Sequence, residues 1–185
     1  MLKDTLAQCA EKMTKSIHAL EEHLASIRTG RASTRLFEDL DVEAYGVTQP
    51  LKQMATIASP DAKTVTIQPW DKSQLGAIEK AILAANLGFT PNNDGKLIRI
   101  VVPPLTEERR REYVKQAHQV AEEGRVAIRN VRRHVNDEIK KLEKDHDISE
   151  DERDKALKRV QEMTDEQIKM ADELLAAKEK EIMEV

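Results

Sequence analysis

The sequence predicts an α+β protein: an elongated, antiparallel three-helix bundle with a small α+β (β/α/β) domain inserted after its first helix, L-shaped overall. Three observations support this prediction. Apolar residues recur every three or four positions in three long segments, which indicates amphipathic helices. The intervening residues 30–105 alternate polar and apolar side chains, as short strands do. Charged residues make up 35% of the chain and aromatic residues only 3%, which is typical of long solvated helices.

The first helix is expected to run from the N-terminus to about residue 27. Neither proline nor glycine interrupts this stretch before Gly30, which stands where a helix would be stopped. The apolar positions follow one helix face, in steps of three and four residues: Leu2, Leu6, Cys9, Met13, Ile17, Leu20, Leu24 and Ile27.

The inserted domain is expected to contain a small sheet. Its predicted strands either alternate in polarity or are rich in β-branched side chains, and they lie at residues 40–45, 47–59, 64–68 and 96–102. Pro50 divides the second of these stretches into shorter strands. About 75 residues are near the lower limit for an independent core.

One helix is expected between the last two strands, with Ser73 as its cap and Gly88 beyond its end. The residues expected to point inward from it are Leu75, Ile78, Ile82 and Ala85. The NNDG sequence at residues 92–95 predicts a turn. Trp70, which follows Pro69 at a strand end, is expected to lie in the domain core, with an exposed partner contact as the alternative.

The second and third helices are expected to begin at Thr106 and Ser149. Pro103 and Pro104 cannot continue a strand ladder, and Thr106 can then cap the free amides of a helix. Ser149 and Glu152 match the S-x-x-E capping box. The apolar stripe of the second helix contains Tyr113, Ala117, Val120, Gly124, Ile128, Val131, Val135, Ile139 and Leu142, and that of the third contains Leu157, Val160, Thr164, Ile168, Ala171, Leu175 and Ile182.

None of the three apolar stripes can be buried by its own helix, so we expect them to pack against one another at shallow angles. The connection at residues 145–149 is short, which favours antiparallel neighbours within one chain. A coiled-coil dimer of the same helices is the alternative arrangement.

The chain is expected to pass twice between two domains. Residues 1–29 and 106–185 form the predicted bundle, and residues 30–105 form the inserted domain. Two short, adjacent connections permit a hinge while they restrict sliding. The residues expected to form this hinge are Thr29, Gly30, Pro103, Pro104 and Leu105.

Positive charge is concentrated in the second helix, although the net charge of the chain is −4. Five basic residues fall on one side of this helix, and we call them the basic face: Arg125, Arg129, Arg132, Arg133 and Lys140. At about 100° per residue they lie beside the apolar stripe, with Arg132 nearest to it. Guanidinium groups suit phosphate because they present a rigid fork of donors and stay charged. A polyanionic partner is therefore expected, and a solvated face paired with the acidic third helix is the alternative.

Arginines near the domain connections could extend the basic face. They are Arg28 and Arg31 at the first connection and residues 109–111 at the second. Simple solubility at the helix start, together with pairing to Glu107 and Glu108, explains the second group equally well.

No catalytic or metal centre is expected. The five histidines show no H-E-x-x-H spacing, and no phosphate-binding or nucleophile motif of the G-x-x-x-x-G-K, G-x-G-x-x-G or G-x-S-x-G type occurs. Cys9 is expected to be a small core residue, and a single cysteine fits a reducing cytosol. No apolar run approaches 18 residues, so no membrane span is expected.

Four motifs resemble, in order and along essentially the whole chain, those of the bacterial ribosome recycling factor (ribosome-releasing factor) family. They are RTGRAS at residues 28–33, PPLTEERR at 103–110, RVAIRNVRR at 125–133 and DISED at 147–151. The resemblance implies a translation factor that binds the post-termination ribosome. With elongation factor G and GTP hydrolysis, such a factor splits the ribosome into subunits for another round of initiation.

The resemblance further implies that the bundle lies on large-subunit ribosomal RNA while the smaller domain swings about the hinge. By motif it implies RNA contacts for Arg129 and Arg132, and for Arg28 and Arg31 at the end near the hinge; we add Arg125 and Arg133, which share the third motif. We expect a cytoplasmic monomer that is not an enzyme and holds no cofactor. A helical adaptor without an RNA role and a general RNA chaperone are the alternative functions.

Overall fold

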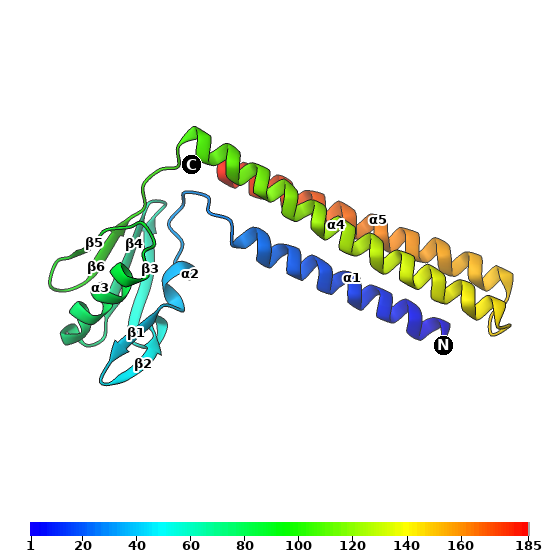
Figure 1. Ribbon diagram of the computed structural model, residues 1–185, viewed down its shortest axis with the longest axis horizontal. Coiled ribbons are helices and arrows are strands. Elements are labelled where there is room, and N and C mark those ends of the chain that lie inside the picture. The colour runs from blue at the N-terminus through cyan, green and yellow to red at the C-terminus, as the bar shows by residue number, and fades with distance from the viewer. Residues whose placement is uncertain (185) are drawn as a thin grey trace. The chain divides into compact units, whose positions relative to one another are not determined.

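The structure, a computed structural model, describes residues 1–184 in two compact units (Figure 1). Residues 1–29 and 107–184 form a helical bundle, and residues 30–106 form an α+β unit that interrupts the bundle after its first helix. The predicted fold class, a three-helix bundle with an inserted small α+β unit, is confirmed.

Three long helices make up the bundle: α1 (Leu2–Ala25), α4 (Glu107–Lys144) and α5 (Glu150–Met183). They run side by side, α4 is antiparallel to the other two, and each helix contacts both of its neighbours (Figure 1). The shared core is almost entirely aliphatic and includes Met13, Leu20, Ile128, Ile139, Val160 and Ile182. Because the three apolar stripes meet there, the helices are stabilised by mutual burial rather than by their own propensity.

Side-chain hydrogen bonds mark the ends of two of these helices. At the start of α5, the Ser149 hydroxyl accepts a hydrogen bond from the backbone N–H of Glu152 (3.2 Å), whose carboxylate accepts one from the backbone N–H of Ser149 (2.8 Å). This capping box confirms the predicted start. The C-terminal end of α1 is at Ala25, about two residues earlier than expected. There the Ser26 hydroxyl donates a hydrogen bond to the backbone carbonyl of His23 (2.6 Å).

The α+β unit contains one hairpin and one four-stranded antiparallel sheet, together with short helices. The hairpin pairs β1 (Asp41–Ala44) with β2 (Val47–Pro50). The sheet has the order β3 (Ala55–Asp61), β4 (Thr64–Pro69), β6 (Ile98–Val101) and β5 (Pro91–Asn93). The remaining elements are α2 (Arg35–Glu38), α3 (Leu75–Ala84) and the 3-10 turns η1 (Leu51–Gln53) and η2 (Lys72–Gln74). A separate core, centred on Phe37, Leu51, Ile67, Ile78 and Ile100, holds them together.

The expected cap of the helix in this unit is wrong. Ser73 does not cap α3, whose N-cap position is Gln74 and has no side-chain cap hydrogen bond. Asp71 instead caps the preceding turn η2: its Oδ1 accepts hydrogen bonds from the backbone N–H (3.0 Å) and the hydroxyl (2.8 Å) of Ser73. The chain therefore enters a 3-10 turn before α3 begins at Leu75. Because α3 ends at Ala84, Ala85 is exposed rather than inward-facing.

The predicted turn at residues 92–95 is too long. Asn92 and Asn93 pair with β6 as part of β5, and the turn that follows reaches Gly95, whose φ is +85°. Neither β5 nor α2 was expected from the sequence, because segments of three and four residues are too short to show a period.

Trp70 was expected to lie in the domain core, but this prediction is wrong: the residue is 69% exposed. Along β4 the buried positions alternate at Val65, Ile67 and Pro69, so the next residue falls on the outward side. The indole Nε1–H donates a hydrogen bond to the hydroxyl of Thr56 (3.2 Å) on β3, which holds the ring against the sheet surface.

Candidate nucleic-acid interface

The basic face lies on α4, an uninterrupted helix of 38 residues. From Arg125 to Lys140 it extends about 22 Å along the helix axis at 1.5 Å per residue. The adjacent side of the same segment is buried in the bundle through Ile128, Val135 and Ile139. Because this packing prevents the helix from bending or rotating, the spacing between the basic residues is set by the bundle.

Arg125 is largely enclosed, with a side chain only 17% exposed. Its Nε donates to Oε2 of Glu122 (3.0 Å), and its Nη1 donates to Oδ1 of Asp172 on α5 (3.0 Å). These bonds tie α4 to α5 and supply two carboxylates to one guanidinium. Arg125 therefore presents no free cation, and a structural role at the α4–α5 interface explains its position.

Arg129 is more open and has a single ion-pair partner among residues 1–184. Its Nη1 donates to Oε1 of Glu122 at 3.1 Å, and its side chain is 37% exposed. Glu122 therefore accepts from Arg125 through one carboxylate oxygen and from Arg129 through the other. These hydrogen bonds, first from Arg125 and then from Arg129, lower the pKa of Glu122 below its ordinary value.

The other three members of the basic face have no carboxylate partner among residues 1–184. Arg132 donates from Nη1 to the amide oxygen of Gln161 on α5 (3.3 Å), a neutral acceptor that orients the guanidinium without neutralising it. Arg133 and Lys140 are exposed and form no hydrogen bond or ion pair within the described chain. The uncompensated positive charge of the basic face is thus concentrated at Arg132, Arg133 and Lys140.

The arginines near the domain connections are divided between the two units. Arg28 belongs to the bundle and Arg31 to the α+β unit, and both are exposed. Arg110 donates to the backbone carbonyl of Met183 (3.4 Å), and Arg111 pairs with Glu107. The alternative of local pairing therefore applies to Arg111.

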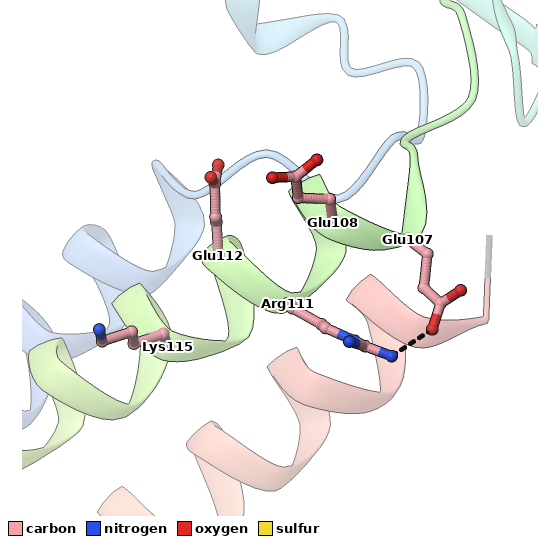
Figure 2. Close-up of a pocket in the computed structure, with 5 residues that line it drawn as sticks. All are labelled: Glu107, Glu108, Arg111, Glu112 and Lys115. Atoms are coloured by element: carbon pink, nitrogen blue, oxygen red, sulfur yellow. Dashed lines mark hydrogen bonds and ion pairs between the residues drawn. The ribbon is translucent and has the colours of Figure 1, made fainter.

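A shallow surface hollow over the first turns of α4 has a mixed charge (Figure 2). Its lining consists of Glu107, Glu108, Arg111, Glu112 and Lys115. Three carboxylates against two cations make this hollow unsuited to bind a polyanion. Acidic residues at the first turn instead stabilise the helix, whose N-terminus carries a partial positive charge.

Both connections between the units are anchored to one turn of the α+β unit. The backbone N–H of Ala32 donates to the carbonyl of Ala62 (2.8 Å), and the backbone N–H of Val102 donates to the carbonyl of Lys63 (2.7 Å). Two segments that are 70 residues apart in sequence thus leave the unit from adjacent points in the β3–β4 turn. Of the residues expected at the hinge, Thr29 and Gly30 are buried, Gly30 with a φ of +78°, whereas Pro103 and Pro104 are exposed.

Nothing in residues 1–184 assembles a metal centre, since no three His, Cys, Asp or Glu side chains converge there. Cys9 is fully buried, and burial raises the pKa of its thiol, which therefore stays protonated as expected of a core residue. Within the described helices, no stretch is both long and apolar enough to cross a lipid bilayer.

Two residues important to the basic face were not singled out from the sequence. Glu122 lies three and seven positions before the two arginines that it holds, and this spacing was a usable signal because such positions share a helix face. Gln161 offered no comparable signal, because its contact with Arg132 depends on how α4 and α5 are aligned.

The chain is similar to known proteins along its whole length. The family described as "Ribosome recycling factor" matches residues 20–183. Proteins named ribosome-recycling factor from Desulforapulum autotrophicum and Carboxydothermus hydrogenoformans are 50% and 53% identical over 185 residues, which is 100% of this chain and of each relative.

Two solved structures are similar as well. A solution structure of ribosome recycling factor matches with a TM-score of 0.78 and 44% identity, covering 100% of this chain and 98% of that one. The other, described as models for the T. thermophilus ribosome recycling factor and the E. coli elongation factor G bound to the E. coli post-termination complex, matches with a TM-score of 0.66 and 49% identity. It covers 99% of both chains.

Proposed function

The chain belongs to the ribosome recycling factor family, and on this premise we propose a separate role for each of its two units. The protein is a translation factor that binds the post-termination ribosome. Together with elongation factor G and GTP hydrolysis, it separates the ribosome into subunits for another round of initiation. In our proposal the basic face of α4 holds large-subunit ribosomal RNA, while the α+β unit moves about the two connections.

The observation that carries the RNA-binding proposal is the cluster of uncompensated cations at Arg132, Arg133 and Lys140. Charged groups on a packed helix keep a constant spacing, so they meet phosphates without a large loss of side-chain and backbone entropy. Arg132 is also oriented by Gln161, which favours bidentate contact with phosphate. Arg129 joins this surface through its exposed portion, and Arg28 and Arg31 are proposed as contacts near the connections.

The shared anchor of the two connections supports a hinge. A unit whose two links are hydrogen-bonded to adjacent residues, Ala62 and Lys63, can rotate about that point with little change in either link. Thr29, Gly30, Pro103, Pro104 and Leu105 are proposed to absorb the rotation. A push on the α+β unit is then transmitted through two short links to a bundle held on RNA.

We propose further that the protein itself makes and breaks no covalent bond. Its action is to bind and to transmit force, and the free energy comes from GTP hydrolysis during its cooperation with elongation factor G. In this proposal the protein works in the cytoplasm as a monomer and needs no cofactor.

Breakdown of purified polysomes tests the function directly. The protein, elongation factor G and GTP are expected to convert polysomes into free subunits when all three are present, and not when any one is left out. Sedimentation profiles report the outcome. If omission of elongation factor G or GTP leaves subunit release unchanged, the proposed cooperation is wrong.

A further inference from the structure

Glu122 lies beside the basic face, and among residues 1–184 it is the one acidic residue there whose two carboxylate oxygens both accept hydrogen bonds from arginines. Oε2 accepts from Arg125 at 3.0 Å and Oε1 accepts from Arg129 at 3.1 Å. The side chain of Glu122 is 54% exposed, so solvent and ligands can reach the carboxylate. An anion already sits between two guanidiniums of the proposed RNA-binding surface.

The two arginines depend on Glu122 to different degrees. Arg125 keeps a second carboxylate partner, Asp172, and lies mostly within the α4–α5 interface. Arg129 has no other hydrogen-bond or ion-pair partner among residues 1–184. The orientation and the effective charge of Arg129 are therefore governed by Glu122, whereas those of Arg125 are not.

A carboxylate bound to two guanidiniums resembles a bound phosphate group. The carboxylate is planar and the phosphate tetrahedral, but both are oxyanions that accept hydrogen bonds from guanidinium groups. A phosphate that approaches Arg129 must use the remaining donors of the guanidinium or displace the Glu122 carboxylate. Displacement is favourable only for a phosphate held in the matching position by the rest of the RNA, and a phosphate that uses the remaining donors is repelled by the nearby carboxylate. A loosely bound polyanion gains little from Arg129.

We propose that Glu122 is a positioning residue of the RNA-binding surface: it holds Arg129 in one orientation and competes for it with mismatched phosphates, so that the basic face discriminates between its ribosomal site and unrelated RNA. This inference rests on the proposed function. It makes Glu122 a determinant of specificity, with affinity for generic RNA kept low by a built-in competing anion.

Two binding measurements over a range of KCl concentrations test this role. One uses isolated large ribosomal subunits, and the other uses an RNA duplex of unrelated sequence. Glu122→Gln is compared with Glu123→Gln, a matched control that removes one negative charge from the neighbouring position. The Glu123 carboxylate accepts a hydrogen bond from Gln119 and pairs with no arginine among residues 1–184. Because both glutamates are exposed, both variants are expected to fold, and circular dichroism checks this.

For Glu122→Gln we expect binding to the unrelated duplex to tighten about threefold to tenfold, with a salt dependence steeper by about one ion, because Arg129 becomes available to any phosphate. Affinity for large subunits is expected not to rise, since the orientation of Arg129 is lost. The ratio of the two affinities therefore falls. Glu123→Gln is expected to change both affinities by the same small factor and to leave the ratio intact.

A second comparison shows whether the effect passes through Arg129. In an Arg129→Ala background, Glu122→Gln is expected to change the ratio no more than Glu123→Gln does. An unchanged or higher ratio in Glu122→Gln, a fall that Glu123→Gln shares, or a fall that persists without Arg129 would each overturn the inference.

The Arg132→Ala variant distinguishes a failure of this inference from a failure of the proposed function. If that variant binds large subunits normally, the RNA-binding surface is wrong; if it binds weakly while Glu122→Gln behaves like the control, only the role of Glu122 is wrong.

Discussion

Gly124 of α4 lies directly against Leu20 of α1. A methyl group at Gly124 would stand 3.2 Å from Cδ2 and 3.4 Å from Cδ1 of Leu20, which is fully buried. The missing side chain thus lets two long helices approach at the middle of the bundle. Glycine lowers helix stability by about 1 kcal/mol relative to alanine, so its presence in α4 is explained by this contact and not by local preference.

Gly124→Ala is therefore expected to lower the free energy of unfolding by about 1 kcal/mol, because overpacking in a dense core outweighs the gain in helix propensity. Gly76→Ala in α3 is the matched control: no atom lies within 4 Å of the added methyl group, and stability is expected to rise by about 0.5 kcal/mol. Denaturant unfolding followed by circular dichroism measures both. A stabilised Gly124→Ala variant would show that Leu20 moves aside freely.

Arg132→Ala is expected to weaken binding to large ribosomal subunits about tenfold and to reduce the salt dependence by about one ion. The reason is that Arg132 contributes an oriented guanidinium with no carboxylate partner in the described chain. Arg159→Ala removes the same charge from α5, where Arg159 pairs with Glu162, and is expected to leave binding nearly unchanged. Equal losses in the two variants would indicate a response to net charge alone.

Lys178 predicts a dependence of stability on alkaline pH. Its side chain is only 9% exposed, its one ion-pair partner in the described chain is Glu181 at 3.8 Å, and burial lowers the pKa of its ammonium below the ordinary 10.5. The unfolded chain binds this proton more tightly than the folded chain does. Unfolding free energy is therefore expected to rise as the pH increases from the folded pKa towards 10.5.

Lys178→Met is the corresponding variant. Replacing a poorly paired buried charge with an apolar side chain of similar length is expected to raise stability at pH 7 by about 1–2 kcal/mol. The rise towards pH 10.5 that Lys178 causes in the natural protein is expected to disappear from this variant. Chemical denaturation at several pH values measures the difference between the two proteins, and parallel pH curves would contradict the assignment.

The capping box of α5 predicts a dependence at acidic pH. Hydrogen bonds from the backbone N–H and then the hydroxyl of Ser149 lower the pKa of Glu152 below its ordinary 4.5. The stabilisation is fully present above pH 4.5 and is lost as the pH falls through the lower pKa of the folded state. Glu152→Gln is expected to flatten this part of the curve, measured by thermal unfolding between pH 5 and 3. Glu150→Gln, in the same turn, serves as the control.

Local sequence patterns predicted most of the fold, because the deciding interactions are themselves local. The three apolar stripes define long helices, and the S-x-x-E pattern at Ser149 defines the start of α5. Where the deciding interaction was not periodic, the prediction failed. Ser73 does not cap α3 but lies in a 3-10 turn that Asp71 caps, and β5 is a strand of three residues that pairs with β6.

The candidate site was predicted less completely than the fold. Helical spacing placed all five residues of the basic face on one side of α4, but it could not show which of their charges are available. The charge of Arg125 is compensated by the carboxylates of Glu122 and Asp172, whereas Arg132 donates a hydrogen bond to the neutral Gln161. Asp172 and Gln161 lie 47 and 29 residues away from those arginines.

By itself, therefore, the sequence determined three amphipathic helices, a small inserted α+β unit and a row of basic side chains along one helix. Only the tertiary structure decided which arginines stay uncompensated and where both connections are anchored. The physical reason is one of range. A period of 3.6 residues sets directions around a single helix, while ion pairs between helices depend on the relative rotation and axial alignment that core packing selects.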